Sequence, residues 1–449
     1  MQDAFELVIR DNPLPATTGR ICRYHCKVRC RRADADEAVA QGEVHRYIAD
    51  YAYNTGLADT VHEKLLDERL PATGKKIAVI GAGPAGVTAA YYLARLGHAV
   101  TIYDANEGPG GIVRFTIPEY RLPRAVLERE IGFIKRFGVK FKYRTRVGTD
   151  VQLAQLEKAF DAIFVAVGAQ DNASLAIPGI NLRGVIPGVE FLEEVARDRR
   201  PNVGKQVCII GAGNVAIDAA RSAHRIGAQV TVIYRRERAD MSAHAEEVHD
   251  AEREGVKFRF LAAPKSVIGS KGVVTGLEIE RMIPGDVDSS GRRTPVASGQ
   301  CEVIPCETVM LAIGERVNAD FLKPLGVKLH KDGTIDVHPL TLQTSHPKVY
   351  AGGDATIGPS TASEAMASGK KFAEVIDTQL MGGESRFPQL FREIHYSNEI
   401  PAVPQPGGKR PLRELPVAAR RGNFWEISSG LSEKNALAEA CRCLRCDVK

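Results

Sequence analysis

The sequence has no apolar run long enough to cross a bilayer, for which a helix needs about 20 predominantly apolar residues. The first ten residues carry Asp3 and Glu6 and lack the apolar core of a signal peptide, so we expect a cytoplasmic protein. Charge of one sign is not in excess either, because 60 Lys and Arg against 55 Asp and Glu leave a net charge of +5. A balance this mild does not indicate a nucleic-acid partner.

Cysteine is sparse through most of the 449 residues and concentrated near the two ends. In a reducing compartment, such tight groups indicate metal ligation more than disulfide bonds. The gaps in the first group are three residues long and differ from the two-residue gaps of the common ferredoxin motif. Zinc is therefore an alternative to an iron–sulfur cluster, since thiolates bind both zinc and iron. The two groups are Cys22, Cys26 and Cys30, and Cys441, Cys443 and Cys446.

The first of two glycine-rich turns lies between a strand pattern at residues 76–80 and a helix pattern at 87–96. Glycines in such a turn permit a tight bend, a close approach of the backbone to a pyrophosphate, and packing of the helix on the strand. The free N–H groups at the helix start attract phosphate. A second strand, at 99–103, ends at an acid suited to ribose hydroxyls. The predicted contacts are Gly81, Gly83, Pro84, Ala85, Gly86 and Asp104.

The same plan recurs with a strand at 207–210, a helix at 216–226 and a strand at 229–234. Alanine replaces the third glycine, which is an accepted variant. Where an acid would bind a free ribose 2′-hydroxyl, this chain has arginines, whose guanidinium groups match phosphate oxygens. We therefore expect NADP(H) in preference to NAD(H), with a solvated basic loop as the alternative. The predicted contacts are Gly211, Gly213, Asn214, Val215, Ala216, Arg235, Arg236 and Arg238.

Two strand–helix–strand units of this kind predict an α/β fold with two Rossmann-like dinucleotide-binding domains. A helical stretch at 43–53 precedes a linker at 71–74, and the Pro- and Arg-rich end of the chain finishes in a short helix from Ser432. The expected domains are a small helical domain at 1–73, a first dinucleotide domain at 74–190 with 311–380, a second at 191–310, and a tail at 381–449.

Several further segments give the chain a resemblance to a known family. They are Gly110-Gly111, Ile117–Pro123, Ala166–Gly168 and Gly352–Asp354. Together with the two turns, they make the chain similar to the small subunit of glutamate synthase and its relatives. These relatives include the reductase half of dihydropyrimidine dehydrogenase and the large subunit of the bifurcating NADH-dependent ferredoxin:NADP oxidoreductase. The resemblance covers nearly the whole chain except residues 381–430.

The resemblance implies that the first turn holds FAD and the second NAD(P)H. Asp354 would then lie at the ribityl or pyrophosphate part of the flavin, although capping of the following helix is a common alternative role. Asn214 and Glu246 would lie near the nicotinamide, with a surface carboxylate as the alternative for Glu246. The other cofactor-binding residues implied are Gly111, Arg121, Gly168 and Gly353.

The resemblance also implies that Cys22, Cys26 and Cys30 ligate a [4Fe-4S] cluster in an N-terminal helical iron–sulfur domain. His45 stands where some relatives have a non-cysteine ligand, an exposed helix histidine being the alternative. The family's further cysteines, usually upstream, are missing here, and residues 439–446 look like the start of that motif displaced to the C-terminal end. Six grouped cysteines and His45 supply one cluster easily; a second needs a further ligand.

Hydride transfer between nicotinamide and flavin requires stacked rings and no general base, so we assign no catalytic residue. The segment at 110–123 has no cysteine, unlike disulfide reductases of this plan, and Cys301 and Cys306 are expected to be structural thiols. We therefore expect an FAD-dependent NAD(P)H oxidoreductase subunit that passes single electrons through iron–sulfur clusters to a partner subunit or ferredoxin-like protein, which the basic residues at 20–32 would suit. A glutamate synthase small subunit is the alternative, and a redox-inactive scaffold the remote one.

Overall fold

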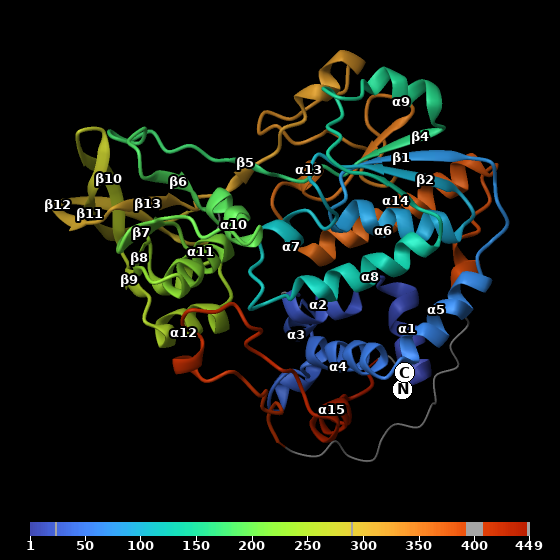
Figure 1. Cartoon of the computed structure of the whole chain (residues 1–449), viewed down its shortest axis with the longest axis horizontal. Helices are drawn as coiled ribbons and strands as arrows, with labels where there is room; N and C mark the ends of the chain where they lie inside the picture. Colours follow the sequence, from blue (N-terminus) through green and yellow to red (C-terminus); the bar gives the residue numbers. More distant parts are fainter. Residues whose placement is uncertain (23–24, 289–290, 392–406, 447–449) are drawn as a thin grey trace.

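The computed structural model describes residues 1–22, 25–288, 291–391 and 407–446, and its first sheet is parallel with strand order β15-β4-β1-β2-β3. Helices α6 and α14 pack against each other beside this sheet (Figure 1). The strands are β1 (Lys76–Ile80), β2 (Ala99–Tyr103), β3 (Lys140–Lys142), β4 (Ala162–Val165) and β15 (Val349–Ala351). The helices are α6 (Pro84–Arg95), α7 (Ile112–Phe115), α8 (Arg124–Arg136), α9 (Leu153–Ala159), α13 (Asp354–Ile357) and α14 (Ala362–Leu380).

The second sheet repeats this architecture with strand order β6-β13-β7-β8-β9, again parallel. Its strands are β6 (Val185–Pro187), β7 (Gln206–Ile210), β8 (Gln229–Ile233), β9 (Lys257–Arg259) and β13 (Thr308–Leu311), with helices α10 (Gly188–Ala196), α11 (Asn214–Arg225) and α12 (Ala245–Glu254). The second sheet extends beyond the expected domain limits of 191 and 310. Strand β6 and the last residue of β13 lie outside those limits, yet the two strands pair with each other in this sheet. The chain therefore enters and leaves this sheet at adjacent strands.

An antiparallel three-stranded sheet extends from the second unit, at the left of Figure 1. It contains β10 (Ala262–Ser270), β11 (Val273–Val287) and β12 (Arg293–Pro305). Two short strands, β5 (Asp171–Asn172) and β14 (Glu315–Arg316), pair antiparallel where the chain crosses between the two units in both directions. The short 3-10 helices are η1 (Arg31–Asp34), η2 (Arg238–Asp240), η3 (Asp320–Leu325), η4 (Phe387–Leu390) and η5 (Val417–Ala419).

The N-terminal helices share one continuous core with the first unit. This core joins Phe5 and Val61 of the helical segment to Tyr91 of α6 and Phe133 of α8. Glu130 of α8 also accepts hydrogen bonds from the backbone N–H groups that begin α2, 2.6 Å from that of Ala16. The helices are α1 (Gln2–Asp11), α2 (Pro15–Ile21), α3 (His25–Val28), α4 (Gln41–Asn54) and α5 (Leu57–Asp67). The helical segment is thus fixed to the first unit by burial.

The C-terminal segment at 407–431 runs over α12 and then returns to the N-terminal helices (Figure 1). Gly422 N–H donates to the carbonyl of Arg225 in α11, and Glu426 pairs with Arg20 and Arg46 of the helical segment. Helix α15 (Glu433–Ala440) begins after Ser432, as predicted, and packs on α4. This segment therefore ties the second unit to the N-terminal helices.

Candidate functional site

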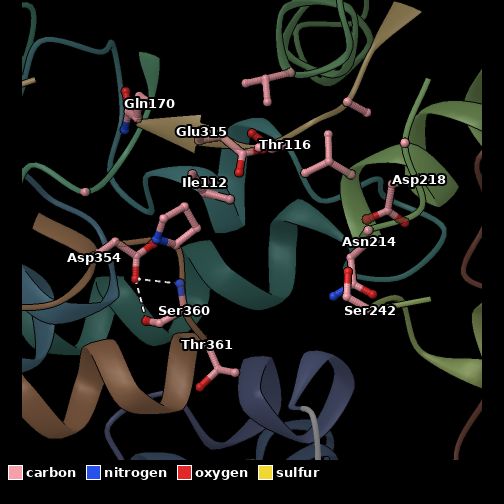
Figure 2. Close-up of a pocket in the computed structure, with 18 of the residues that line it drawn as sticks. Ile112, Thr116, Gln170, Asn214, Asp218, Ser242, Glu315, Asp354, Ser360 and Thr361 are labelled. Atoms are coloured by element: carbon pink, nitrogen blue, oxygen red, sulfur yellow. Dashed lines mark hydrogen bonds between the residues drawn. The ribbon is translucent and has the colours of Figure 1, made fainter. Parts of the chain in front are cut away.

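A large cavity, of about 940 Å³, lies between the two parallel sheets at the carboxyl ends of their strands. Both glycine-rich turns line it, and so does the segment at 352–354. In Figure 2, Asp354 and Ser360 extend from one side, Asn214 and Asp218 come from α11 on the other, and Glu315 lies between them. Its size and its two turns make this cavity the candidate site for a pair of cofactors.

The first glycine-rich turn has the geometry that a dinucleotide requires. Gly81 has φ of +104°, and a Cβ there would lie 2.3 Å from the carbonyl oxygen of Ala166, so only glycine fits. A Cβ on Gly83 would meet no atom within 4 Å, because this glycine faces the open cavity. The start of α6 follows directly, with its N–H groups available to an anion. The turn can therefore cradle a pyrophosphate.

The Asp104 side chain accepts hydrogen bonds from the turn and from the residues that follow β2. Its Oδ2 accepts a hydrogen bond from Ala82 N–H at 2.6 Å, and its Oδ1 accepts one from Asn106 N–H at 2.8 Å. Burial raises the pKa of Asp104, while these backbone donors lower it. The carboxylate lines the cavity as well, so it fixes the turn, and its contact with a ribose stays a prediction.

Asp354 stands at the other end of the first sheet, beside β15. Its Oδ1 accepts hydrogen bonds from the hydroxyl (2.5 Å) and the backbone N–H (3.2 Å) of Ser360, which are drawn as dashed lines in Figure 2. Ser360 directly precedes Thr361, the N-cap of α14, so Asp354 holds the segment that leads into this helix, and its contact with a flavin stays a prediction. Burial raises the pKa of both Asp354 and Glu315, and each carboxylate lines the cavity.

The second turn matches the first. Gly211 has φ of +131°, and a Cβ there would lie 2.0 Å from the carbonyl oxygen of Ala312. Gly213 precedes α11 and lines the cavity, with Ser242 as its nearest neighbour. Asn214 Oδ1 accepts a hydrogen bond from His244 N–H at 3.1 Å, which anchors the start of α12 to the turn. Glu246 does not line the cavity; its side chain is 70% exposed and pairs with Lys409.

Arg121 lies where the two units meet. Its Nη1 donates to Asp218 Oδ2 of α11 at 2.7 Å, and its Nε lies 3.3 Å from Glu247 Oε1 of α12. The preceding Tyr120 is buried, with its ring against the guanidinium of Arg225. Arg121 thus lines the cavity while it bridges the segment at 117–123 to both helices of the second unit.

Most of the residues predicted from the sequence line this one cavity. Exceptions are Gly86 and Ala216, which pack inside the turns, and Arg238, whose guanidinium donates to Glu252 at 2.7 Å. Those that do line it are Gly81, Gly83, Pro84, Ala85, Asp104, Gly111, Arg121, Gly168, Gly211, Gly213, Asn214, Val215, Arg235, Arg236, Gly353 and Asp354. Sequence reasoning did not single out Thr116, Gln170, Arg292, Glu315 or Ser360, which the fold adds to the lining.

The first cysteine group begins at the rim of this cavity. Ile21 lines the cavity, and the next residue, Cys22, has its Sγ 3.3 Å from the hydroxyl oxygen of Ser363 at the start of α14. Burial raises the pKa of Cys26, and the charge of Cys22 adds to this shift, since the two sulfurs are close. Cys30 accepts a hydrogen bond from Val39 N–H.

The described residues contain no group of three or more His, Cys, Asp or Glu side chains arranged to hold a metal ion. The donor chemistry nevertheless fits an iron–sulfur cluster, because the described cysteines form no disulfide bond and three of them fall within nine residues. His45 is half-buried and burial lowers its pKa, so the alternative of an exposed histidine is wrong. Arg23 and residues 392–406 and 447–449 lie outside the described part.

The C-terminal cysteines lie in a segment held against the loop that follows Cys30. Arg442, which is fully buried, donates to Asp36 at 2.9 Å and to Glu439 at 2.6 Å. Arg32 in turn donates to Asp36 and to the carbonyl of Arg442. The fold thus brings to one region two cysteine groups that are about 410 residues apart in sequence. The remaining cysteines lie elsewhere, Cys208 and Cys306 buried in the second unit and Cys301 exposed on β12.

Two family matches cover most of the chain. Residues 75–369 match the family described as pyridine nucleotide-disulphide oxidoreductase. Residues 1–57 match the domain described as dihydropyrimidine dehydrogenase domain II, 4Fe-4S cluster.

The chain belongs to the pyridine nucleotide-disulphide oxidoreductase family. It is accordingly an FAD- and NAD(P)H-dependent oxidoreductase with an N-terminal 4Fe-4S domain, which confirms the predicted family, fold class and cofactors. The chain is also similar to the small chain of glutamate synthase [NADPH] of Escherichia coli K12, at 33% identity over 83% of this chain and 82% of that protein. No described helix is long and apolar enough to span a membrane.

Two relatives match nearly the whole chain. The beta subunit of NADP(+)-dependent formate dehydrogenase from Moorella thermoacetica is 40% identical, over 99% of this chain and 67% of that protein. The beta subunit of NADPH-Fe(3+) oxidoreductase from Geobacter sulfurreducens is 35% identical, over 98% of this chain and 70% of that protein. Among solved structures, Mycobacterium tuberculosis FprA in complex with NADPH has the same fold, with a TM-score of 0.58 and 21% identity over 71% of this chain and 87% of that one.

Proposed function

We propose that this chain is the flavoprotein subunit of a larger enzyme, taking hydride from NADPH onto FAD and delivering single electrons to a partner protein. FAD supplies the necessary chemistry, since a flavin accepts a hydride pair and can release its electrons one at a time. Three relatives carry the words subunit or small chain in their names together with NADP or NADPH. We therefore propose that the electron acceptor is a partner subunit or a ferredoxin-like protein.

The observation that carries the proposal is the position of Cys22. Ile21 lines the cofactor cavity and Cys22 contacts Ser363, and the two residues before Ser363, Thr361 and Ala362, line the cavity too. If FAD occupies this cavity as proposed, the 4Fe-4S domain borders the flavin site directly. Such contact is what a short route for single electrons requires.

In this proposal the chain's own residues bind and orient the two cofactors. Gly83 and the start of α6 would hold the FAD pyrophosphate, Gly213 and the start of α11 that of NADPH. Asp354, kept in place by Ser360, would face the flavin side of the cavity. No described side chain has to donate or accept a proton for hydride transfer, in keeping with the absence of an assigned catalytic residue.

The preference for NADPH rests on Arg235 and Arg236. Arg236 has only 10% of its side chain exposed, so it is not part of a solvated loop, whereas Arg235 is exposed; both arginines line the cavity. Arg238 is directed to Glu252 instead, because α12 places an acid within its reach. A phosphate on the ribose 2′-oxygen would be attracted to the first two.

For the cluster we propose Cys22, Cys26 and Cys30 as ligands, with His45 and the C-terminal cysteines (Cys441, Cys443, Cys446) as candidates for the remaining positions. The buried Arg442 network supports this proposal, since it packs the C-terminal segment onto the loop after Cys30. Val28, Arg29 and Arg31 are exposed beside this group, which suits docking of an acidic partner. We also propose a cytoplasmic location and domains at 1–73, 74–190 with 311–380, 191–310 and 381–449, with the exception that β6 and all of β13 belong to the second unit.

A glutamate synthase small subunit is the second candidate. The formate dehydrogenase and NADPH-Fe(3+) oxidoreductase relatives match 98–99% of this chain, against 83% for the glutamate synthase relative. The longer matches favour an electron-transfer subunit of the first kind.

The test is an anaerobic titration of the purified chain. Flavin, iron and acid-labile sulfide are quantified, and the protein is then titrated with NADPH and separately with NADH while flavin absorbance is recorded. The proposal expects FAD, about four or more irons per chain, and bleaching at lower concentrations of NADPH than of NADH. A chain that binds FAD without iron, or that NADH bleaches at the same concentrations, contradicts it.

A further inference from the structure

The two glycine-rich units can be compared residue by residue at the end of their second strand. In the first unit Gly81 N–H donates to the carbonyl of Tyr103, and Asp104 follows. In the second unit Gly211 N–H donates to the carbonyl of Ile233, and Tyr234 follows. Tyr234 therefore occupies the position that Asp104, the predicted ribose contact, has in the first unit. Arg235 and Arg236 follow it. This corner of the cavity thus has cationic side chains near the position where the first unit has an acid.

The antiparallel hairpin of β11 and β12 folds its turn back onto this corner. Asp288, at the end of β11, accepts a hydrogen bond from Arg236 Nη2 at 2.7 Å. The same carboxylate accepts one from Arg292 N–H at 3.2 Å, and Asp288 N–H donates to the carbonyl of Arg292 at 2.7 Å. Asp288 thus connects Arg292 to Arg236 at the strand end of the second unit.

Arg292 is carried into the cavity by this arrangement. It lines the cavity together with Arg235 and Arg236, although 56 residues separate it from Arg236 in sequence. Burial and the charge of Asp240 raise the pKa of Tyr234, whereas the charges of Arg236, Arg292 and Arg235 oppose that shift. All three guanidinium charges therefore act on the same phenol, and all three side chains line the same cavity.

The corner also contains a buried donor that no side chain or backbone group of the described residues satisfies, the Nε–H of Arg236. A buried N–H without an acceptor costs free energy, and a bound anion would remove that cost. Asp288 holds the Nη2 of the same guanidinium, so this Nε–H is fixed in direction. The corner thus combines a preorganised donor with two further cations.

We propose that Arg292 binds the 2′-phosphate of NADP(H) together with Arg235 and the Nε–H of Arg236, and that Asp288 is the positioning residue that fixes both Arg236 and the hairpin turn. This inference rests on the proposed use of NADPH and names the residues that set the preference. Arg238 is no longer proposed as a phosphate ligand, because its guanidinium is paired with Glu252. Arg292, from the antiparallel sheet, is proposed instead.

The test measures equilibrium binding to the FAD-loaded protein by isothermal titration calorimetry, with NADP+, NAD+ and 2′,5′-ADP as probes. Arg292→Gln is expected to weaken NADP+ and 2′,5′-ADP about tenfold, because a charge-assisted hydrogen bond to phosphate is lost, and to leave NAD+ unchanged. Arg292→Lys should recover part of the loss. The matched control is Arg293→Gln, the exposed neighbour that does not line the cavity, and it should bind all three probes as the unaltered protein does.

Asp288→Asn tests the positioning role. It should weaken NADP+ binding and raise the KM for NADPH with little change in kcat, while NAD+ binding stays constant; a general loss of fold would weaken the binding of both nucleotides. Arg292→Gln that binds NADP+ as tightly as the unaltered protein, while Arg235→Gln does not, overturns the role of Arg292 and leaves the NADPH preference standing. An unaltered protein that binds NADP+ and NAD+ equally overturns the preference itself.

Discussion

Arg121 Nη1 lies 2.7 Å from Asp218 Oδ2, and this ion pair joins the segment after α7 to helix α11 across the floor of the cofactor cavity. Both side chains are 10% exposed or less. Burial raises the pKa of Asp218 to about 6, and the charge of Arg121 opposes that rise. Because buried charges depend on their partners, the pair fixes the relative position of the two dinucleotide units at the place where their cofactors would meet.

Arg121→Met should therefore destabilise the FAD-loaded protein by about 3–5 kcal/mol, because it leaves the buried Asp218 carboxylate without its cationic partner. The measurement is urea unfolding at neutral pH. Arg136→Met is the matched control, since its partner Glu63 is 65% exposed, and an exposed pair contributes about 0–1 kcal/mol. Equal losses in the two variants would contradict the structural role of the Arg121 pair.

Substitutions at the two turns should separate the two nucleotide sites. Gly83 and Gly213 both have extended backbone that any residue adopts, with φ of −72° and −87°, so valine should be tolerated by the fold. Gly83→Val should then lose FAD on gel filtration, since its side chain fills the space in front of α6, whereas Gly213→Val should keep FAD and lose NADPH binding. Gly132→Ala in α8, which also meets no atom within 4 Å, is the control and should keep both.

Removal of single cysteines should identify the cluster ligands. Cys22→Ser and Cys26→Ser are expected to lower the iron and acid-labile sulfide content and to leave the FAD content unchanged, because the glycine-rich turns are untouched. Cys301→Ser is the control, since Cys301 is exposed on β12 beside Lys265, and it should retain all iron. Cys443→Ser reports on the C-terminal group: iron loss there would support its part in ligation, and full retention would exclude it.

Stability should depend on pH through Glu130. Burial raises its pKa to about 7 from an ordinary value of 4.5, although Ala16 and Thr17 N–H groups lower it. The folded state thus holds this proton more tightly than the unfolded chain, so the free energy of unfolding falls as pH rises from about 4.5 to 7 and then levels off, by on the order of 3 kcal/mol.

Glu130→Gln should remove this decline, which urea unfolding between pH 5 and 8 would detect as a growing advantage of the variant toward high pH. The exposed Glu63→Gln serves as the control and should follow the unaltered protein. Parallel curves for Glu130→Gln and the unaltered protein would show that the Glu130 carboxyl titrates normally.

The turns at Gly81 and Gly211 could be predicted from sequence because their requirements are local: a strand, a positive φ and a helix start within a few residues. The same holds for Ser432, whose hydroxyl caps α15. Predictions failed where a side chain's direction depends on a distant element. Arg238 follows the other arginines in sequence, but Glu252 of α12 draws it away from the cavity.

Other features have no sequence signal of this kind. Arg292 reaches the cavity because Asp288, which directly follows β11, accepts hydrogen bonds from both Arg236 and the Arg292 N–H. Glu426 lies in a tail with no recognisable motif, yet it pairs with Arg20 and Arg46 of the first helices and ties the second unit to them. Such contacts follow from chain topology, which composition and periodicity do not contain.

In the proposed function, electrons from NADPH pass through the flavin cavity into the iron–sulfur domain that borders it. The most direct measurement is rapid mixing with NADPH without oxygen, with flavin absorbance followed in parallel with low-temperature EPR of frozen samples. The account predicts flavin bleaching followed by a cluster signal in the unaltered protein, bleaching without the cluster signal in a Cys22→Ser, Cys26→Ser double variant, and neither in Gly213→Val. A cluster signal that develops in Gly213→Val, or before any flavin bleaching, would contradict it.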